Sequence, residues 1–240
     1  MISVKSFFEA VELIVDNFEG GYYHPEMFKD GRIKDPNGKL WEIYKTSGET
    51  MYGLDRLQGG DLNKSEAGKI FWRVIDTQGA KYNWTWNFPF SGKDKVKLLG
   101  GVSLKDLTHG LKFQLSQIMR PTFNKFFNKY LTKNEQDIIE KSKPLQLHFI
   151  YAVWNGEGFF KFYSENFKKD IDKGITDVNQ LFNNQIKLRK SSRYIQIRQS
   201  GEKMERMAFN LIAPDIIPQK KSSYLMYAIV LIAVYLFAIK

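Results

Sequence analysis

Two short glycine-containing segments hold the residues whose types and spacing are best suited to chemistry. The first is Glu19-Gly20-Gly21-Tyr22, which follows a run of apolar residues at helical spacing. A carboxyl group at the end of that helix faces the negative pole of the helix dipole, and Phe18 and Tyr22 give it apolar neighbours. Both effects disfavour the carboxylate, so we expect Glu19 to have the raised pKa that a general acid needs. A solvated glutamate before an ordinary glycine cap is the alternative.

The second segment is Gly48-Glu49-Thr50-Met51-Tyr52-Gly53, which we expect to form the rim of a small sheet facing Glu19. The pair of segments indicates a glycan-cleaving site. Hydrolysis of a glycosidic bond usually needs a second carboxylate, which holds a water molecule or stabilises the oxocarbenium-like transition state. The sequence leaves that second carboxylate open among four acidic residues: Glu49, Asp30, Asp35 and Asp55.

Three aromatic rings recur at alternate positions within residues 82–90: Tyr82, Trp84 and Trp86. Amphipathic rings of this kind pack against the C–H faces of sugars, which favours a sugar-binding platform. A core-filling loop or an edge strand explains the same pattern, and both interpretations stay open.

The composition excludes several kinds of site. The chain of 240 residues has no cysteine, so thiol catalysis and cysteine-ligated zinc are excluded. Its three histidines form no close metal-ligand pair, and we expect neither a metal nor a cofactor. The net charge of +10 favours an anionic partner, which includes acidic wall polymers, lipid headgroups and nucleic acid.

One predicted helix, from Asp177 to about Ile197, becomes strongly basic along its length. Its basic residues form either a solvated face or a surface for acidic wall polymer or lipid phosphates. They are Lys187, Arg189, Lys190, Arg193 and Arg198.

The elements that must position the two segments begin with an amphipathic helix from Val4 to Phe18, in which Ser6 and Glu9 have capping-box spacing. The dipeptide Asn37-Gly38 predicts a β-hairpin within residues 31–44, and residues 51–54 supply a third strand. Capping-box spacing also predicts a helix that opens with residues 63–66 and runs to Ile75.

The second half of the chain is predicted to be helical. One helix spans 104–118 and stops before Pro121, because proline lacks the amide that a helix interior requires. Further helices are expected at 123–130, from the capping box at 132–135, at 144–154, at 159–167 and at 204–212. The fold class is therefore α+β and mostly α, with one small antiparallel β lobe after the first helix.

The end of the chain has a different character. Residues 224–239 are uncharged and apolar, and lysines flank them on both sides. This length is at the short limit for a membrane span, so we expect a transmembrane anchor after a linker at 213–223; a buried C-terminal helix is the alternative. The first residues contain Glu9 and Glu12 where a signal peptide would be apolar, so we expect no cleavable signal peptide.

Taken together, Glu19-Gly-Gly-Tyr22 and Gly48-Glu-Thr-Met-Tyr-Gly53 resemble the muramidases of glycoside hydrolase family 108, found in bacteria and their phages. The segment Ala152-Val-Trp-Asn-Gly-Glu-Gly158 is similar to a segment of lytic transglycosylases. The resemblance implies a lysozyme-like catalytic domain at 1–212.

By the same resemblance, Glu19 is the general acid, Thr50 orients a water or the carboxylate, and Asn155 hydrogen-bonds the sugar. The resemblance does not fix the second acid, and Glu49 is kept as a catalytic candidate beside Glu19 and Thr50. The expected substrate contacts besides Asn155 are Tyr22, Tyr52, Trp84 and Trp86.

The resemblance implies peptidoglycan as the partner and cleavage of the β-1,4 bond between N-acetylmuramic acid and N-acetylglucosamine. Hydrolysis and transglycosylation both remain open. A phage origin would place the anchored enzyme in a virion membrane or in the host cell membrane, acting on the wall. The alternatives are a lysozyme-fold protein that binds peptidoglycan, or builds a virion membrane, without catalysis. Nucleic acid is not the expected partner, because no binding motif accompanies the charge.

Overall fold

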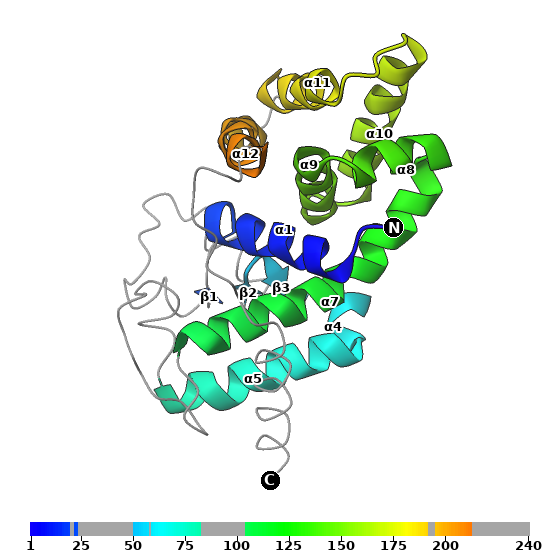
Figure 1. The fold of residues 1–240 in the computed structure, drawn as a ribbon. Coiled ribbons are helices and arrows are strands. Elements are labelled where there is room, and N and C mark those ends of the chain that lie inside the picture. The colour runs from blue at the N-terminus through cyan, green and yellow to red at the C-terminus, as the bar shows by residue number, and fades with distance from the viewer. Residues whose placement is uncertain (20–21, 24–49, 58, 83–103, 192–194, 213–240) are drawn as a thin grey trace. The chain divides into compact units, whose positions relative to one another are not determined.

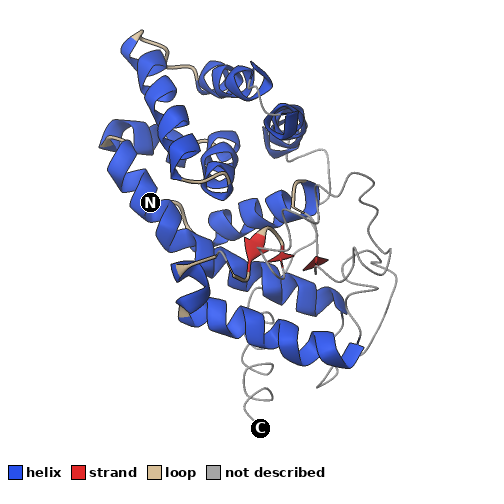
Figure 2. Cartoon of the chain, turned by 180° about the vertical axis from the view of Figure 1, so that it is seen from behind, coloured by secondary structure: helices blue, strands red, loops and turns tan. Residues whose placement is uncertain are grey.

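The computed structural model describes residues 1–19, 22–23, 50–57, 59–82, 104–191 and 195–212. They belong to two compact units, one containing Met1–Phe18 and Met119–Lys220 and the other Glu19–Ile118 and Lys221–Lys240. The described residues are mostly helical, with one small antiparallel sheet (Figure 1, Figure 2). This confirms the mostly α, α+β class. No helix among them is long and apolar enough to cross a membrane, and the predicted span at 224–239 lies outside them.

Helix α9 is the centre of the first unit. It packs against α1, α8, α10, α11 and α12, and Leu145, Phe149 and Ile150 are fully buried. A helix that is apolar on nearly every side is stable only when other helices surround it. The helices of this unit are α1 (Val4–Asn17), the second part of α7 (Leu104–Tyr130), α8 (Lys133–Glu140), α9 (Lys143–Trp154), α10 (Glu157–Asp172), α11 (Val178–Ser191) and α12 (Ile195–Ile212).

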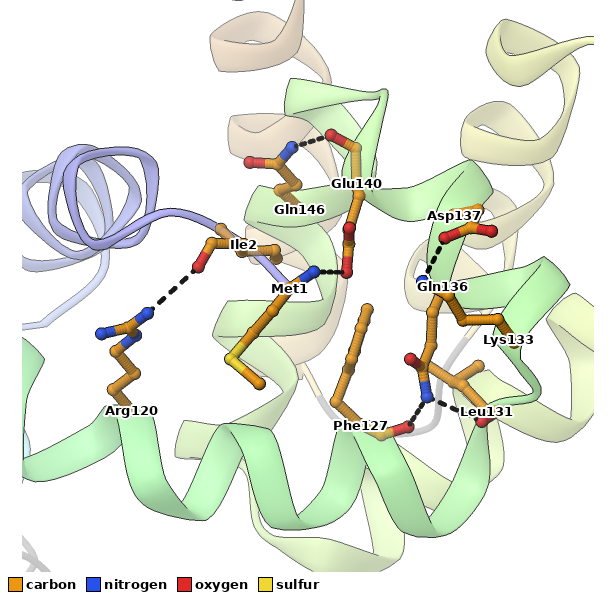
Figure 3. Close-up of polar contacts among 10 residues, drawn as sticks. All are labelled: Met1, Ile2, Arg120, Phe127, Leu131, Lys133, Gln136, Asp137, Glu140 and Gln146. Carbon is orange, nitrogen blue, oxygen red and sulfur yellow. Dashed lines mark hydrogen bonds and ion pairs between the residues drawn. The ribbon is translucent and has the colours of Figure 1, made fainter.

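The start of α1 is held by its cap and by two neighbouring helices. The N-cap is Ser3, whose hydroxyl accepts the amide of Ser6, so the predicted cap at Ser6 is wrong by one turn. Arg120 of α7 donates to the carbonyl of Ile2 at 3.3 Å, and the amino group of Met1 is paired with Glu140 of α8 (Figure 3). These contacts fix the helix that leads to Glu19.

Helix α7 runs through Pro121 without interruption, so the predicted stop before this proline is wrong. Proline removes one backbone hydrogen bond of the helix. This loss is offset because the turns that follow Pro121 are deeply buried. Phe123 and Phe127 are 1% and 2% exposed, and their rings stack at 5.0 Å. Packing of this kind outweighs the local preference of one residue.

The boundaries of the later helices agree with the sequence where caps mark them. Thr132 forms a complete capping box with Glu135 at the start of α8, and α9 has Pro144 in its first turn. Helix α10 begins at Glu157, two residues before the predicted start. Helix α11 ends at Ser191 and α12 already begins at Ile195, so the predicted helix to Ile197 is too long and the last helix starts earlier than expected.

The second unit contains the sheet, formed by β1 (Tyr22–Tyr23), β2 (Thr50–Met51) and β3 (Leu54–Asp55) in that order. Strands β2 and β3 are joined by Tyr52 and Gly53, which both have positive φ, 53° and 74°. Two such residues form the type I′ turn that suits a tight hairpin. Residues 51–54 are thus a hairpin turn between two strands, not one strand as predicted; the predicted hairpin at 31–44 lies outside the described residues.

Helices α4 (Asp61–Lys64) and α5 (Glu66–Tyr82) follow the sheet, and α5 lies beside the first part of α7. The cap of α5 is Ser65, whose hydroxyl accepts the amide of Gly68 at 3.0 Å. The predicted cap at Asn63 is therefore wrong, because that side chain is used elsewhere, as described below.

Candidate functional site

Glu19 lies directly after the end of α1. Phe18 is the C-cap, and its amide donates to the carbonyl of Ile14 at 2.8 Å. The Glu19 side chain is half-buried, and this burial raises the pKa of its carboxyl from 4.5 to about 7. The raised pKa expected from the sequence is thus confirmed, with desolvation as the cause. A carboxyl group in this state can hold a proton near neutral pH and give it up.

Strand β1, which follows Glu19 in the chain, begins at the end of the sheet where the β2–β3 turn lies. Tyr22 pairs with Met51 and Tyr23 pairs with Thr50, so β1 begins beside the turn end of the β2–β3 hairpin. Tyr52, in that turn, combines a positive φ with a side chain that is only 2% exposed. A bulky residue adopts this backbone conformation only where its surroundings enforce it.

Thr50 occupies the middle strand. Its side chain is 9% exposed, and its hydroxyl has no hydrogen-bond partner among the described residues. A buried hydroxyl without a partner is destabilising, and it retains a donor and an acceptor for any group that comes within reach. The role that the resemblance implies for Thr50, orienting a water or the carboxylate, stays a prediction.

Of the four candidates for the second carboxylate, the described residues include Asp55. It lies in β3 directly opposite Thr50, and opposite residues of an antiparallel pair project from the same face with Cβ atoms about 5 Å apart. The next pair, Met51 and Leu54, projects from the other face and is buried at 0% and 4% exposure. The hydroxyl and the carboxyl group therefore share the face opposite this apolar pair. Glu49, Asp30 and Asp35 lie outside the described residues.

The backbone of Asp55 is held by Asn63. The side-chain amide of Asn63 donates to the carbonyls of Asp55 and Arg56 at 2.8 and 2.7 Å, and its oxygen accepts the indole N–H of Trp72 at 2.8 Å. Sequence reasoning missed this role. An asparagine three residues before a glutamate has the spacing of a helix cap, and the sequence alone does not distinguish the two uses.

Arg56 adds a second connection from β3 to α5. Its guanidinium forms two hydrogen bonds with Asp76, at 2.6 and 2.8 Å, and lies 5.1 Å from the ring centre of Trp72. The bidentate geometry fixes the direction of the arginine. Asp55 is therefore held through Asn63 of α4, and Arg56, the residue after β3, is held through Asp76 of α5.

Asn155 belongs to the first unit. It is the C-cap of α9, half-buried, and its side-chain amide donates to the carbonyl of Tyr151 at 3.1 Å. Of the other expected sugar contacts, Tyr22 is described by its backbone alone, Tyr52 is buried, and Trp84 and Trp86 lie outside the described residues. Their substrate contacts stay predictions.

Arg189 differs from its prediction. It is fully buried, so it belongs neither to a solvated basic face nor to an exposed polymer-binding surface. Its Nε atom donates to Nδ1 of His148 at 3.0 Å and its Nη2 atom to the carbonyl of His148 at 3.1 Å. Burial, and then the charge of Arg189, hold the pKa of His148 well below 6.5. Lys187 and Lys190 on the same helix are exposed.

Comparisons with protein families, with curated proteins and with solved structures gave no match to this chain. The described residues also contain no group of three His, Asp or Glu side chains arranged to hold a metal ion. The chemistry of the site is therefore argued from its own residues.

The arrangement provides two groups suited to acid–base chemistry. Glu19 is partly protonated near neutral pH because burial raises its pKa to about 7. Thr50 and Asp55 form a polar pair on the sheet that the chain enters three residues after Glu19. Hydrolysis of a glycosidic bond uses a protonated carboxyl group together with a second carboxylate.

Proposed function

We propose that this protein cleaves the glycan strands of peptidoglycan, at the β-1,4 bond between N-acetylmuramic acid and N-acetylglucosamine, with Glu19 as the general acid. The observation that carries the proposal is the half-buried Glu19 carboxyl group, whose pKa burial raises to about 7, at the point where α1 leads into the sheet. The resemblance of the two glycine-containing segments to family 108 muramidases supports the choice of substrate.

In the proposed reaction, the Glu19 carboxyl group gives its proton to the glycosidic oxygen as the bond between that oxygen and C1 breaks. The cation-like C1 then accepts an oxygen nucleophile. In hydrolysis this is water, whose proton passes to a carboxylate, and Asp55 with the Thr50 hydroxyl is suited to hold it. In transglycosylation the C6 hydroxyl of the muramyl residue attacks instead, and Glu19 takes up its proton.

The proposal extends to the rest of the chain. A lysozyme-like domain over 1–212 would carry the reaction, and the apolar residues 224–239 would anchor it in a membrane after the linker at 213–223. A phage origin would place the protein in a virion membrane or a host cell membrane, from which it reaches the wall.

Clearing of purified peptidoglycan in a gel tests the assignment. We expect the full-length chain to clear the gel, Glu19→Gln to be inactive, and Glu12→Gln, a glutamate of the same helix, to match wild type. Clearing by Glu19→Gln at the wild-type rate would remove Glu19 as the acid. Tight binding without clearing by the wild type would favour the non-catalytic alternative.

A further inference from the structure

Two stacked aromatic rings, each in contact with a cation, lie at the end of α1. The ring of Phe18 stacks on Tyr151 of α9, with 4.6 Å between ring centres and 22° between planes. The ammonium of Lys203 lies 5.7 Å from the ring centre of Phe18. The guanidinium of Arg189 lies 5.1 Å from the ring centre of Tyr151. We call these four residues the column.

Each end of the column is held by a second contact. The Lys203 ammonium donates to the carbonyl of Asn17 at 2.9 Å, which is the last residue of α1. A cation at this position satisfies one of the carbonyls that a helix end leaves free, and it opposes the helix dipole. At the other end, Arg189 lies 4.6 Å from the ring centre of Tyr163, so its guanidinium is sandwiched between two tyrosines.

The burial of Arg189 is unusual because no carboxylate among the described residues pairs with it. A buried guanidinium is destabilising unless hydrogen bonds and π systems replace the water it loses. Here His148 accepts two of its N–H groups, and the rings of Tyr151 and Tyr163 lie 5.1 and 4.6 Å from it, whereas its buried Nη1 atom has no hydrogen-bond partner among the described residues. Burial of this residue therefore fixes Tyr151 in one orientation, since the ring is required to solvate the charge.

We propose that the column is a positioning device: Arg189 fixes Tyr151, Tyr151 fixes Phe18, and Lys203 clamps the end of α1, so that Glu19, the next residue, is held in one place. The inference rests on the proposed function, because it takes Glu19 to be the general acid. The contacts of the column do not depend on that function. Three helices, α9, α11 and α12, thereby act on the acid through its neighbour in the chain. Phe18, Tyr151, Arg189 and Lys203 are positioning residues and do not touch the reacting atoms.

The physical argument is that a half-buried carboxyl group depends on the backbone that carries it. If Phe18 is free to move, Glu19 gains access to water, and its pKa falls toward the ordinary value. A displacement of about 1 Å also lowers the rate, because a general acid acts only within hydrogen-bond reach of its target. Among the described residues, the charged and titratable groups packed in or against the column include Lys203, Arg189, Tyr151, His148 and Tyr163.

The test measures the pKa of Glu19 directly, by titrating the side-chain carbonyl carbon of labelled glutamate by NMR in the full-length chain without substrate. We expect Lys203→Met and Tyr151→Leu to lower this pKa by about one unit or more. Lys203→Arg, which keeps the cation and a donor, restores the wild-type value. Phe160→Leu is the matched control, because its ring is fully buried and packs on Phe123 and Phe149 rather than on the column.

The same variants are then assayed on peptidoglycan across pH. We expect the alkaline limb of kcat/KM to move to lower pH in Lys203→Met and Tyr151→Leu and to stay in place in Phe160→Leu; a general loss of stability alone would not move it. An unchanged Glu19 pKa in both column variants would overturn the inference even if the protein cleaves peptidoglycan. A lowered pKa in a protein that cleaves nothing would support the inference and remove the proposed function.

Discussion

Thr50 of β2 lies directly opposite Asp55 of β3, on the face of the sheet opposite to the buried pair formed by Met51 and Leu54. The sequence offers four acids as the second carboxylate, and this register gives one of them a defined neighbour. The chain reaches this sheet three residues after Glu19. The relationship leads to the first prediction.

Asp55→Asn should lower kcat for peptidoglycan cleavage by about 10²–10⁴-fold if hydrolysis uses this carboxylate, because the amide cannot accept the proton of the attacking water. The rate of soluble fragment release from purified peptidoglycan measures it. Asp61→Asn, at a fully exposed position in α4, should match wild type. A wild-type rate for Asp55→Asn would assign the second role to another acid or to transglycosylation.

Asn63→Ala should destabilise the protein by about 2–4 kcal/mol, since it leaves the Trp72 indole N–H and two carbonyls without their partner. Urea unfolding followed by tryptophan fluorescence measures this. Asn210→Ala, on the exposed side of α12, provides the control and should change stability by less than about 0.5 kcal/mol. Equal effects of the two substitutions would show that Asn63 does not support the strand.

Glu19→Gln should stabilise the protein at alkaline pH. The folded protein binds the Glu19 proton more tightly than the unfolded chain, because burial raises the pKa from 4.5 to about 7. Its contribution to the free energy of unfolding therefore falls as pH rises through this window. At pH 8 the neutral amide should gain about 1–3 kcal/mol, the upper end corresponding to the full shift.

Unfolding of wild type and Glu19→Gln at about pH 4 and pH 8 checks this sign. The two proteins should be nearly equal in acid and differ in alkali. A Glu19→Gln variant that is less stable than wild type at pH 8 would mean that the carboxylate is favoured in the folded state.

His148 should make the protein sensitive to acid in the opposite sense. The pKa of His148 in the folded state is held well below 6.5. Just below pH 6.5 the unfolded chain therefore binds a proton on this histidine, whereas the folded protein does not. The contribution of neutral His148 to the free energy of unfolding is present above about pH 6.5 and is lost as pH falls below it. His148→Gln removes the titration while keeping an acceptor for Arg189, so its stability should fall less steeply between pH 6.5 and 5 in urea unfolding. An unchanged slope would contradict the buried neutral histidine.

The sequence predicted those features whose physical cause is local. The cap at Thr132 and the proline in the first turn of α9 mark their helices because the interactions lie within four residues. The raised pKa of Glu19 could be predicted from the apolar residues beside it in the chain, although its cause is desolvation and not the helix end.

Other features depend on residues that are distant in sequence. Pro121 stays inside α7 because buried aromatic packing on the following turns outweighs a lost hydrogen bond. Arg189 was predicted as exposed because it lies in a basic run, but two tyrosines and a histidine from other helices enclose it. The hairpin at 51–54 requires a tyrosine with positive φ, which no propensity favours.

The most direct measurement of the central claim is mass spectrometry of the fragments released from purified peptidoglycan. We predict that the wild-type chain releases muropeptides with newly cut muramic acid ends, and that Glu19→Gln at equal concentration releases none. Reducing muramic acid ends indicate hydrolysis. Anhydro ends, which are lighter by one water, indicate transglycosylation. Release of the same fragments by Glu19→Gln, or no glycan cleavage by the folded wild type, would contradict the account.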